Sequence, residues 1–569
     1  MATSTGISGI DTSFTSPITF SGLGSSVDFS SIIEKLVSVE SARITQYDNW
    51  KQEWTDKITA LQTLNSKLTD FNTAVAAMDT PSQFQGKVAN SSNTSTLTAS
   101  ASTTAATGSH QILVDQLAQN NIRVKTTGVA SADTVINSSG SAQTFVFKYP
   151  STGSDVTISV PNGATLTDLV NAINASGANQ GVTASVLNLG SGANPYTLML
   201  QGKDSGTLNT ITIEGTTTLT GFGSADIPES QAAQNAQVRV DGYPPGSWIQ
   251  RSTNTITDVI PGVSLSLLNT SPTTPVQVTV NDDTSSMQKK VESMVEKYND
   301  VISYIKDQTK YDTSTGESGI LQGNYAVEIV KTELNAIGTG NAPGFQDPND
   351  PYINLSGIGI TTDSDQTSTT FGQLLVDSSA LSAAITSNPQ AVSNLMSYYF
   401  RGVSDDSTGN ITYYSSIPGI TKAGIYNVSA TISGGVLVGG YINGNPATVS
   451  GNTLNGQNGF PEYGLAVSVN TTVDNTYTGT VRLQLGINGA FSDKLTDLLN
   501  VTSGPVNILI DNYNDIVSGI DSKIETEQTR ISNLRSRLTQ QFAKVDTILS
   551  TLNQQSTYLT QQLAKLSSG

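Results

Sequence analysis

The sequence predicts an α+β multidomain chain, with long terminal coiled-coil helices that form a leg or stalk and β-rich head domains inserted between them. Three observations predict this class. Apolar residues recur at every seventh position near both ends of the 569-residue chain. The middle carries short runs of alternating apolar and polar residues between turn residues, which is the pattern of strands. The length also exceeds what one hydrophobic core usually needs.

The first helical pattern covers residues 28–78, where Asp28 or Ser31 is the expected N-cap. The heptad positions a and d in this stretch are mostly aromatic or aliphatic, and two tryptophans lie on the same seam. Such a seam indicates packing against another helix. The predicted interface residues are Tyr47, Trp50, Trp54, Leu61, Leu64, Leu68 and Phe71.

A stronger heptad pattern begins at Ile510, with an aliphatic residue at every a position and a mixed d column. Glycine is absent between Gly519 and the final residue, and proline is absent after Pro505, so we expect one long helix. Its apolar stripe is stabilising only when a partner covers it. The predicted interface residues are Ile510, Val517, Ile524, Ile531, Leu538, Val545, Leu552, Leu559 and Leu566.

The strand and turn patterns divide the rest of the chain. We expect a flexible N-terminal leg segment at 1–45, an N-terminal coiled-coil helix at 46–80, a core β/α head domain at 81–128 and 230–402 that contains a helix at 286–310, an inserted β-rich head domain at 129–229, an additional inserted β domain at 403–490 and a C-terminal coiled-coil leg at 491–569. The two ends then share a stalk, and the middle forms the head.

The composition limits the possible functions. The formal net charge of −18 disfavours nucleic acid and anionic lipid as partners. Cysteine is absent and His110 is the only histidine, which excludes Cys-ligated and multi-His metal sites as well as Cys–His pairs. Carboxylate-only sites remain possible by composition, but the denser acidic clusters lack the spacing of an EF-hand and no catalytic acid pair is recognisable. We expect no cofactor, no metal and no catalytic residues. No apolar run is long enough for membrane insertion, and residues 1–20 lack the features of a cleaved signal peptide.

A glycine pair precedes the first helix. Gly22-Leu23-Gly24 lies between a short β-like run and the helical pattern, in the order of a phosphate-binding loop. The dinucleotide fingerprint needs a third glycine where this chain has Val27, and no Gly-Lys-Ser/Thr follows. We interpret Gly22 and Gly24 as a hinge, because glycine lets the backbone bend with little steric cost.

Several motifs occur in a specific order over most of the chain: Ser21–Asp28, Gly108–Leu117, Thr165–Asn174, Ala236–Gly242, Arg251–Gly262, Gly357–Thr362 and the C-terminal heptads. In this order they resemble the flagellar filament cap proteins, the flagellar hook-associated protein 2 family. Two features depart from the family pattern. The insertion at 403–490 is not in its shortest members, and Asn324 stands where aspartate is more usual.

The resemblance implies a secreted protein at the distal tip of the bacterial flagellum, exported without a cleaved signal peptide and needed for flagellum assembly and motility. It implies a homo-oligomeric ring, often a pentamer, that retains exported flagellin and promotes its insertion at the filament tip. The terminal helices would be legs and the β domains a plate. Other implied partners are the export apparatus with its chaperone and, in some bacteria, host mucin.

Three alternatives remain open at the level of sequence. The first is a surface adhesin that binds host mucin or glycan through its β heads, with 403–490 as the candidate region. The second is a secreted enzyme that uses carboxylates, since the chain has 46 acidic residues but no recognisable catalytic pair. The third is a protein of the hook–filament junction.

Overall fold

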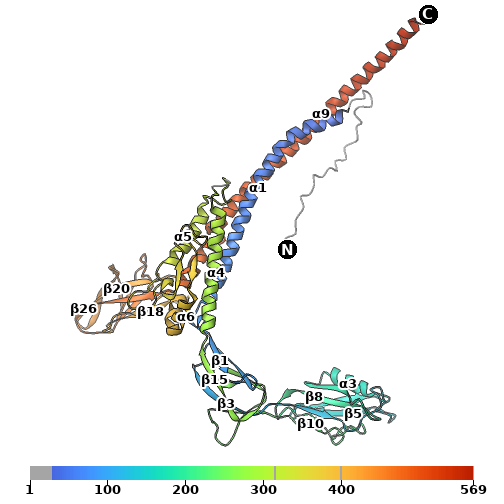
Figure 1. Cartoon of the computed structure of the whole chain (residues 1–569), viewed down its shortest axis with the longest axis vertical. Helices are drawn as coiled ribbons and strands as arrows, with labels where there is room; N and C mark the ends of the chain where they lie inside the picture. The colour runs from blue at the N-terminus through green and yellow to red at the C-terminus, as the bar shows by residue number, and fades with distance from the viewer. Residues whose placement is uncertain (1–27, 313–315, 398–399, 568–569) are drawn as a thin grey trace.

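The computed structural model describes residues 28–312, 316–397 and 400–567. The molecule is elongated: two long helices run side by side into a helical body, one β domain projects from the side of that body, and further β structure follows at its lower end (Figure 1). The described residues form four separate hydrophobic cores, one in the helical body and three in β domains. The fold is therefore the α+β multidomain class that the sequence predicts.

The helical body is centred on the lower half of α1. The Phe71 ring lies 5.8 Å from the ring of Tyr298 and 5.1 Å from that of Phe491, so three helices meet at one aromatic cluster. The elements of the body are α1 (Phe29–Ala76), α2 (Pro81–Phe84), α4 (Thr284–Thr309), α5 (Tyr325–Thr339), η1 (Leu355–Ile358), β16 (Ile360–Thr362), β17 (Leu374–Val376), α6 (Ser378–Ser387), α7 (Pro389–Met396), α8 (Ile487–Leu499) and the start of α9 (Pro505–Ser567).

Short polar side chains cap several helices of the body. The Asp28 carboxylate accepts a hydrogen bond from the backbone N–H of Ser31, so Asp28 is the N-cap of α1. Asp283 caps α4 and Asn324 caps α5 in the same way. Each cap satisfies a backbone donor that the first turn of a helix leaves unpaired.

A first β domain lies directly below the body (Figure 1). It pairs a five-stranded sheet in the order β1-β15-β3-β11-β12 with a three-stranded sheet β13-β14-β2. Alternate residues of β15 point into its core, including Val276, Val278 and Val280. The strands are β1 (Lys87–Ser91), β2 (Leu97–Ala101), β3 (Gly108–Gln116), β11 (Ala236–Val240), β12 (Ile249–Arg251), β13 (Thr255–Ile260), β14 (Val263–Leu267) and β15 (Ser271–Asp282).

A second β domain follows the first, farther from the body (Figure 1). A four-stranded sheet β10-β4-β8-β7, a three-stranded sheet β6-β5-β9 and α3 enclose its core. Thr165 and Asp168 form a capping box at the start of α3. The elements are β4 (Asn120–Val124), β5 (Gln143–Lys148), β6 (Asp155–Val160), α3 (Leu166–Ala175), β7 (Val182–Asn188), β8 (Tyr196–Ser205), β9 (Thr212–Ile213) and β10 (Glu229–Gln231).

The third β domain projects from the side of the helical body (Figure 1). Two antiparallel sheets, β18-β26-β20-β21-β22 and β19-β25-β24-β23, enclose one core. We call it the side domain, residues 401–484. Its strands are β18 (Arg401–Ser404), β19 (Ile411–Ser415), β20 (Gly424–Ser433), β21 (Val436–Ile442), β22 (Asn445–Pro446), β23 (Thr448–Ser450), β24 (Thr453–Asn455), β25 (Ala466–Val469) and β26 (Asn475–Gln484).

The observed elements differ from the expected division at three places. Residues 29–45 are helical in α1, which agrees with the helical pattern at 28–78 but not with the flexible segment expected at 1–45. The expected core head domain contains two cores, because α4 packs in the helical body while the strands of 87–118 and 236–282 form their own core. Helix α8 contributes to the core of the body rather than to the C-terminal leg. Helical periodicity shows that a face is buried but does not identify its partner.

Candidate functional site: the terminal helix pair

Helices α1 and α9 form an antiparallel pair (Figure 1). Polar contacts cross the seam along its length, and residue numbers fall along α9 as they rise along α1. The contacts join Glu34 to Arg535, Glu40 to Arg530 at 2.6 Å, Arg43 to Glu527 at 3.5 Å, Lys51 to Asp521 at 2.6 Å and Asn65 to Asn507 at 2.6 Å. The main partner of the C-terminal heptad stripe is therefore the N-terminal helix of the same chain.

Aromatic contacts lie at the start of the pair and nearer to the helical body. The rings of Phe29 and Phe542 stack with their centroids 5.2 Å apart, at the point where α1 begins. Near the body, Trp54 meets Tyr513 edge-on at 4.8 Å. Such contacts add to the free energy of burying the rings. Because α1 starts at Phe29, α9 continues beyond Phe542 past the end of its partner.

Two other predicted aromatic residues lie on the rim of the pair. Tyr47 is half-buried, and 38% of Trp50 is exposed. The ammonium group of Lys523 lies 5.2 Å from the Trp50 ring centroid, which is within the range of a cation–π contact. Trp50 therefore contacts α9 at the solvent edge of the seam.

A charged cluster joins the middle of the two helices. The guanidinium of Arg530 donates to Glu527 on α9 and to Glu40 on α1, both at 2.6 Å. These two hydrogen bonds raise the pKa of Arg530. The hydrogen bond from Arg530, helped by the charge of Arg43, lowers the pKa of Glu527 below its ordinary value of 4.5. Both groups are therefore held in their charged forms.

Four of the predicted interface residues have a different role. Leu61, Leu64, Leu68 and Phe71 are fully buried in the core of the helical body, against helices of the same chain. They pack against other helices, as the heptad seam predicts, but those helices belong to the same chain, so these four side chains are not accessible to another molecule. They carry the stability of the body instead.

The predicted residues of α9 are exposed to different degrees. Ile510 packs on the helical body, Ile531 is 9% exposed, and Val517, Ile524 and Leu538 are half-buried. The predicted set lacks Phe29 and Ile520, which are buried, and the half-buried Phe542, which stacks on Phe29. Ile520 is 1% exposed, and the signal for its burial is its place in the mixed d column of the heptads.

The end of α9 carries an exposed apolar face. Val545, Leu552 and Leu559, all predicted interface residues, are 41%, 53% and 60% exposed, and Ile548 and Leu563 are exposed beside them. We call these five residues the terminal face. The helical period brings positions 545, 548, 552, 559 and 563 to one side of the helix. The other predicted residues here lie outside what the structure describes, namely the side chain of Leu566 and the hinge residues Gly22 and Gly24.

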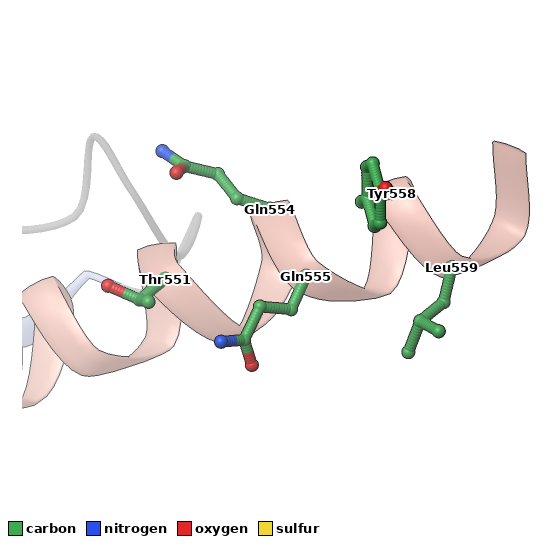
Figure 2. Close-up of a pocket in the computed structure, with 5 residues that line it drawn as sticks. All are labelled: Thr551, Gln554, Gln555, Tyr558 and Leu559. Atoms are coloured by element: carbon green, nitrogen blue, oxygen red, sulfur yellow. The ribbon is translucent and has the colours of Figure 1, made fainter. Parts of the chain in front are cut away.

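A shallow hollow lies on the same part of α9. Figure 2 shows its lining residues, Thr551, Gln554, Gln555, Tyr558 and Leu559, which all extend from this one helix. Small-molecule sites need concave walls that bury most of the ligand, and a single helix supplies only one wall. This surface therefore suits an extended partner, such as another helix, better than a small ligand.

The described residues contain no group of three or more His, Asp or Glu side chains placed to hold a metal ion. Within the same residues, none of the helices combines the length and the apolar character needed to cross a bilayer.

Comparison with known families accounts for most of the chain. The model of the flagellar hook-associated protein 2 C-terminus matches residues 233–554, and that of its N-terminus matches residues 25–121. The chain belongs to the flagellar hook-associated protein 2 family. A third model, the flagellin hook IN motif, matches residues 144–204, which lie in the second β domain.

Individual relatives agree with this family. The chain is 30% identical over 433 residues to flagellar hook-associated protein 2 of Escherichia coli K12, covering 72% of this chain and 87% of the relative. It is 29% identical over 411 residues to the B-type protein of Pseudomonas aeruginosa, covering 67% and 80%. A crystal structure of the D1-D2-D3 domains of the Escherichia coli flagellar cap protein FliD matches 80% of this chain and 99% of the chain in that structure. The TM-score is 0.51 at 23% identity, so the two chains share the fold.

Proposed function

We infer that this chain caps the distal end of the bacterial flagellar filament, where it retains exported flagellin and promotes its insertion at the growing tip. The observation that carries this role, beside the family, is the terminal face. A cap must hold the filament end while new subunits pass beneath it. A long helix that extends past its intramolecular partner and exposes an apolar stripe supplies such a contact.

The partners that follow are flagellin at the filament tip and further copies of this chain. We propose a homo-oligomeric ring, a pentamer in its simplest form, with the helix pairs as legs and the β domains as the plate. We also propose that the chain reaches the tip through the flagellar export apparatus, with a chaperone, and without a cleaved signal peptide. The role is structural and requires no bond chemistry.

The terminal face is the proposed contact with the filament tip. Each leucine side chain that a partner fully covers contributes about 1.5–3 kcal/mol. Replacing both Leu552→Glu and Leu559→Glu should therefore weaken binding to filament ends by roughly 100-fold or more. Cells with this variant should form few filaments and release soluble flagellin into the medium, as cells without the gene should.

A matched control adds the same charge elsewhere on α9. Thr557→Glu with Gln561→Glu changes two exposed polar residues that belong neither to the terminal face nor to the hollow. This control should support normal filaments, and both variants should keep the helix content of the wild type by circular dichroism. Normal capping by the leucine variant would refute the proposed contact.

The hinge stays a separate proposal. If Gly22 and Gly24 let each leg adapt to its own place on the filament, changing both to alanine should slow filament growth while the purified protein still assembles into rings. Filament length measured by microscopy and ring assembly measured by sedimentation test the two halves of this expectation. Unchanged filament length would remove the hinge from the mechanism.

The adhesin alternative has no support from the relatives described above, which are flagellar hook-associated proteins. We therefore do not include binding to host mucin in the proposed function. A deletion strain that keeps its filaments and releases no flagellin would rule out the cap.

A further inference from the structure

Five asparagines of this chain precede a glycine, the dipeptide in which an asparagine side chain is most readily attacked by the backbone. The glycine has no side chain to shield its nitrogen or restrict its approach. The rate in a folded protein then depends on how firmly each pair is held, because a held pair reacts only when it opens locally. The pairs begin at Asn162, Asn443, Asn455, Asn458 and Asn488.

Two of these pairs are fixed by hydrogen bonds to neighbouring segments. The side-chain oxygen of Asn162 accepts from the N–H of Gly140 at 2.9 Å, and the N–H of Gly163 donates to a backbone carbonyl. Both polar atoms of the Asn443 side chain form hydrogen bonds. Its oxygen accepts from the N–H of Asn427 at 2.8 Å, and its nitrogen donates to the carbonyl of Ile425 at 3.3 Å. Neither side-chain carbon is free to approach the next backbone nitrogen.

Two further pairs are also constrained. At Asn455, the attacking atom would be the backbone nitrogen of Gly456. Its N–H instead donates a hydrogen bond to the carbonyl of Leu465 at 2.9 Å. Asn488 lies in the first turn of α8 and is completely buried. A helical backbone holds the attacking nitrogen away from the side-chain carbon of the preceding residue.

Asn458 differs from the other four. It lies in an exposed turn of the side domain, between β24 and β25. Within the part of the chain that the structure describes, no hydrogen bond involves its side chain or the N–H of Gly459. Gly459 has φ +94°, and a side-chain carbon placed on it would meet no atom within 4 Å. The turn can therefore rearrange without disturbing packed atoms.

We propose that Asn458 is a self-modification site, at which the folded protein converts the asparagine to aspartate or isoaspartate. The nitrogen of Gly459 attacks Cγ of Asn458, and a new C–N bond closes a succinimide ring. The amide nitrogen leaves as ammonia with the proton of the glycine N–H. Water then opens the ring at either carbonyl, so the reaction consumes one water and needs no other reagent.

The product changes the charge of one surface. It places a carboxylate two residues before Phe460, a residue that is 39% exposed, in a turn without charged side chains at 457–460. The isoaspartate form also adds a backbone methylene to the turn. The inference does not depend on the proposed capping role, because the chemistry needs only the folded chain and water.

The test follows all five pairs in the full-length folded protein at mildly alkaline pH, by mass spectrometry of peptides taken over time. Asn458 should gain the mass of an amide-to-carboxyl exchange at least about tenfold faster than the other four, which must open first. In denaturant the five rates should become similar. An Asn458→Gln variant should lose the fast reaction and its isoaspartate signal.

Two results would overturn the proposal. One is a folded-state rate at Asn162, Asn443, Asn455 or Asn488 that equals or exceeds that at Asn458. The other is an equally large advantage for Asn458 in the denatured chain, which would assign the effect to flanking sequence rather than to the free turn.

Discussion

Arg482 is the largest side chain among the fully buried residues, and it joins the side domain to the helical body. Its guanidinium contacts Asp405 through two nitrogens, at 2.6 and 2.9 Å, and also bonds to Asp350 and to the carbonyl of Gly344. Burial alone lowers the pKa of Arg482, but its hydrogen bonds to the two carboxylates outweigh this and leave the pKa raised. The guanidinium stays charged because every side of it is paired.

Removing this charge should loosen the side domain. Arg482→Ala leaves two carboxylates without their partner, and breaking a buried ion pair in this way typically costs about 3–5 kcal/mol. Thermal unfolding should show this loss, and limited proteolysis should cut first near the junctions of the side domain. Arg401→Ala, an exposed arginine on the neighbouring strand, is the control and should change little.

A compensating variant separates the charge effect from the loss of packing. Combining Arg482→Met with Asp350→Asn and Asp405→Asn removes all three charges and should recover much of the lost stability, because an apolar replacement of a buried ion group is often neutral. If the combined variant is as unstable as Arg482→Ala, the junction depends on shape rather than on charge.

At the scale of the elements, sequence periodicity predicted both long helices but not the partner of each segment. Leu61 and Leu552 occupy equivalent heptad positions in similar patterns, yet the first lies in the core of the body and the second is exposed. A heptad pattern indicates only that one stripe of a helix is apolar. Whether that stripe is buried depends on helices that are distant in sequence. Trp54 facing Tyr513 likewise required the antiparallel register, which no local pattern contains.

Acid should weaken the helix pair through Glu527. Its pKa is lowered in the folded state, mainly by the hydrogen bond from Arg530, so ionised Glu527 stabilises the pair. This contribution is complete above the ordinary value of 4.5 and is lost as pH falls through the lower folded-state value. Fluorescence of Trp54, with Trp50→Phe and Trp248→Phe, should report the change beside Tyr513.

Glu527→Gln is the matched test of this assignment. It should be less stable than the parent at neutral pH, and it should lose the corresponding part of the acid response. The Glu53→Gln control changes an exposed glutamate on α1 to which no ion pair is assigned among the described residues. Equal acid responses in Glu527→Gln and the parent would show that other carboxylates control the pair.

At the scale of the whole molecule, the regions that stabilise the fold and the region proposed to contact the filament lie at opposite ends. Its four hydrophobic cores lie in the body and the β domains, whereas the terminal face lies at the opposite end, past Phe542 (Figure 1). The sequence predicted this arrangement of rods and heads because periods of 3.6 and 2 residues differ clearly. It did not resolve how many cores the head contains, since adjacent strands can join either of two sheets.

Removing residues 543–569 tests this separation directly. The truncated chain keeps the stacked Phe29 and Phe542 rings and every polar contact that we describe across the pair. The lost helical residues 551–565 are exposed, so the free energy of unfolding should stay within about 0.5 kcal/mol of that of the full chain. Capping should nevertheless fail, because the terminal face is gone, and flagellin should appear in the medium. A truncated chain that unfolds would show that the end of α9 stabilises its own molecule, while one that still caps filaments would place the filament contact on the helix pair or the β domains.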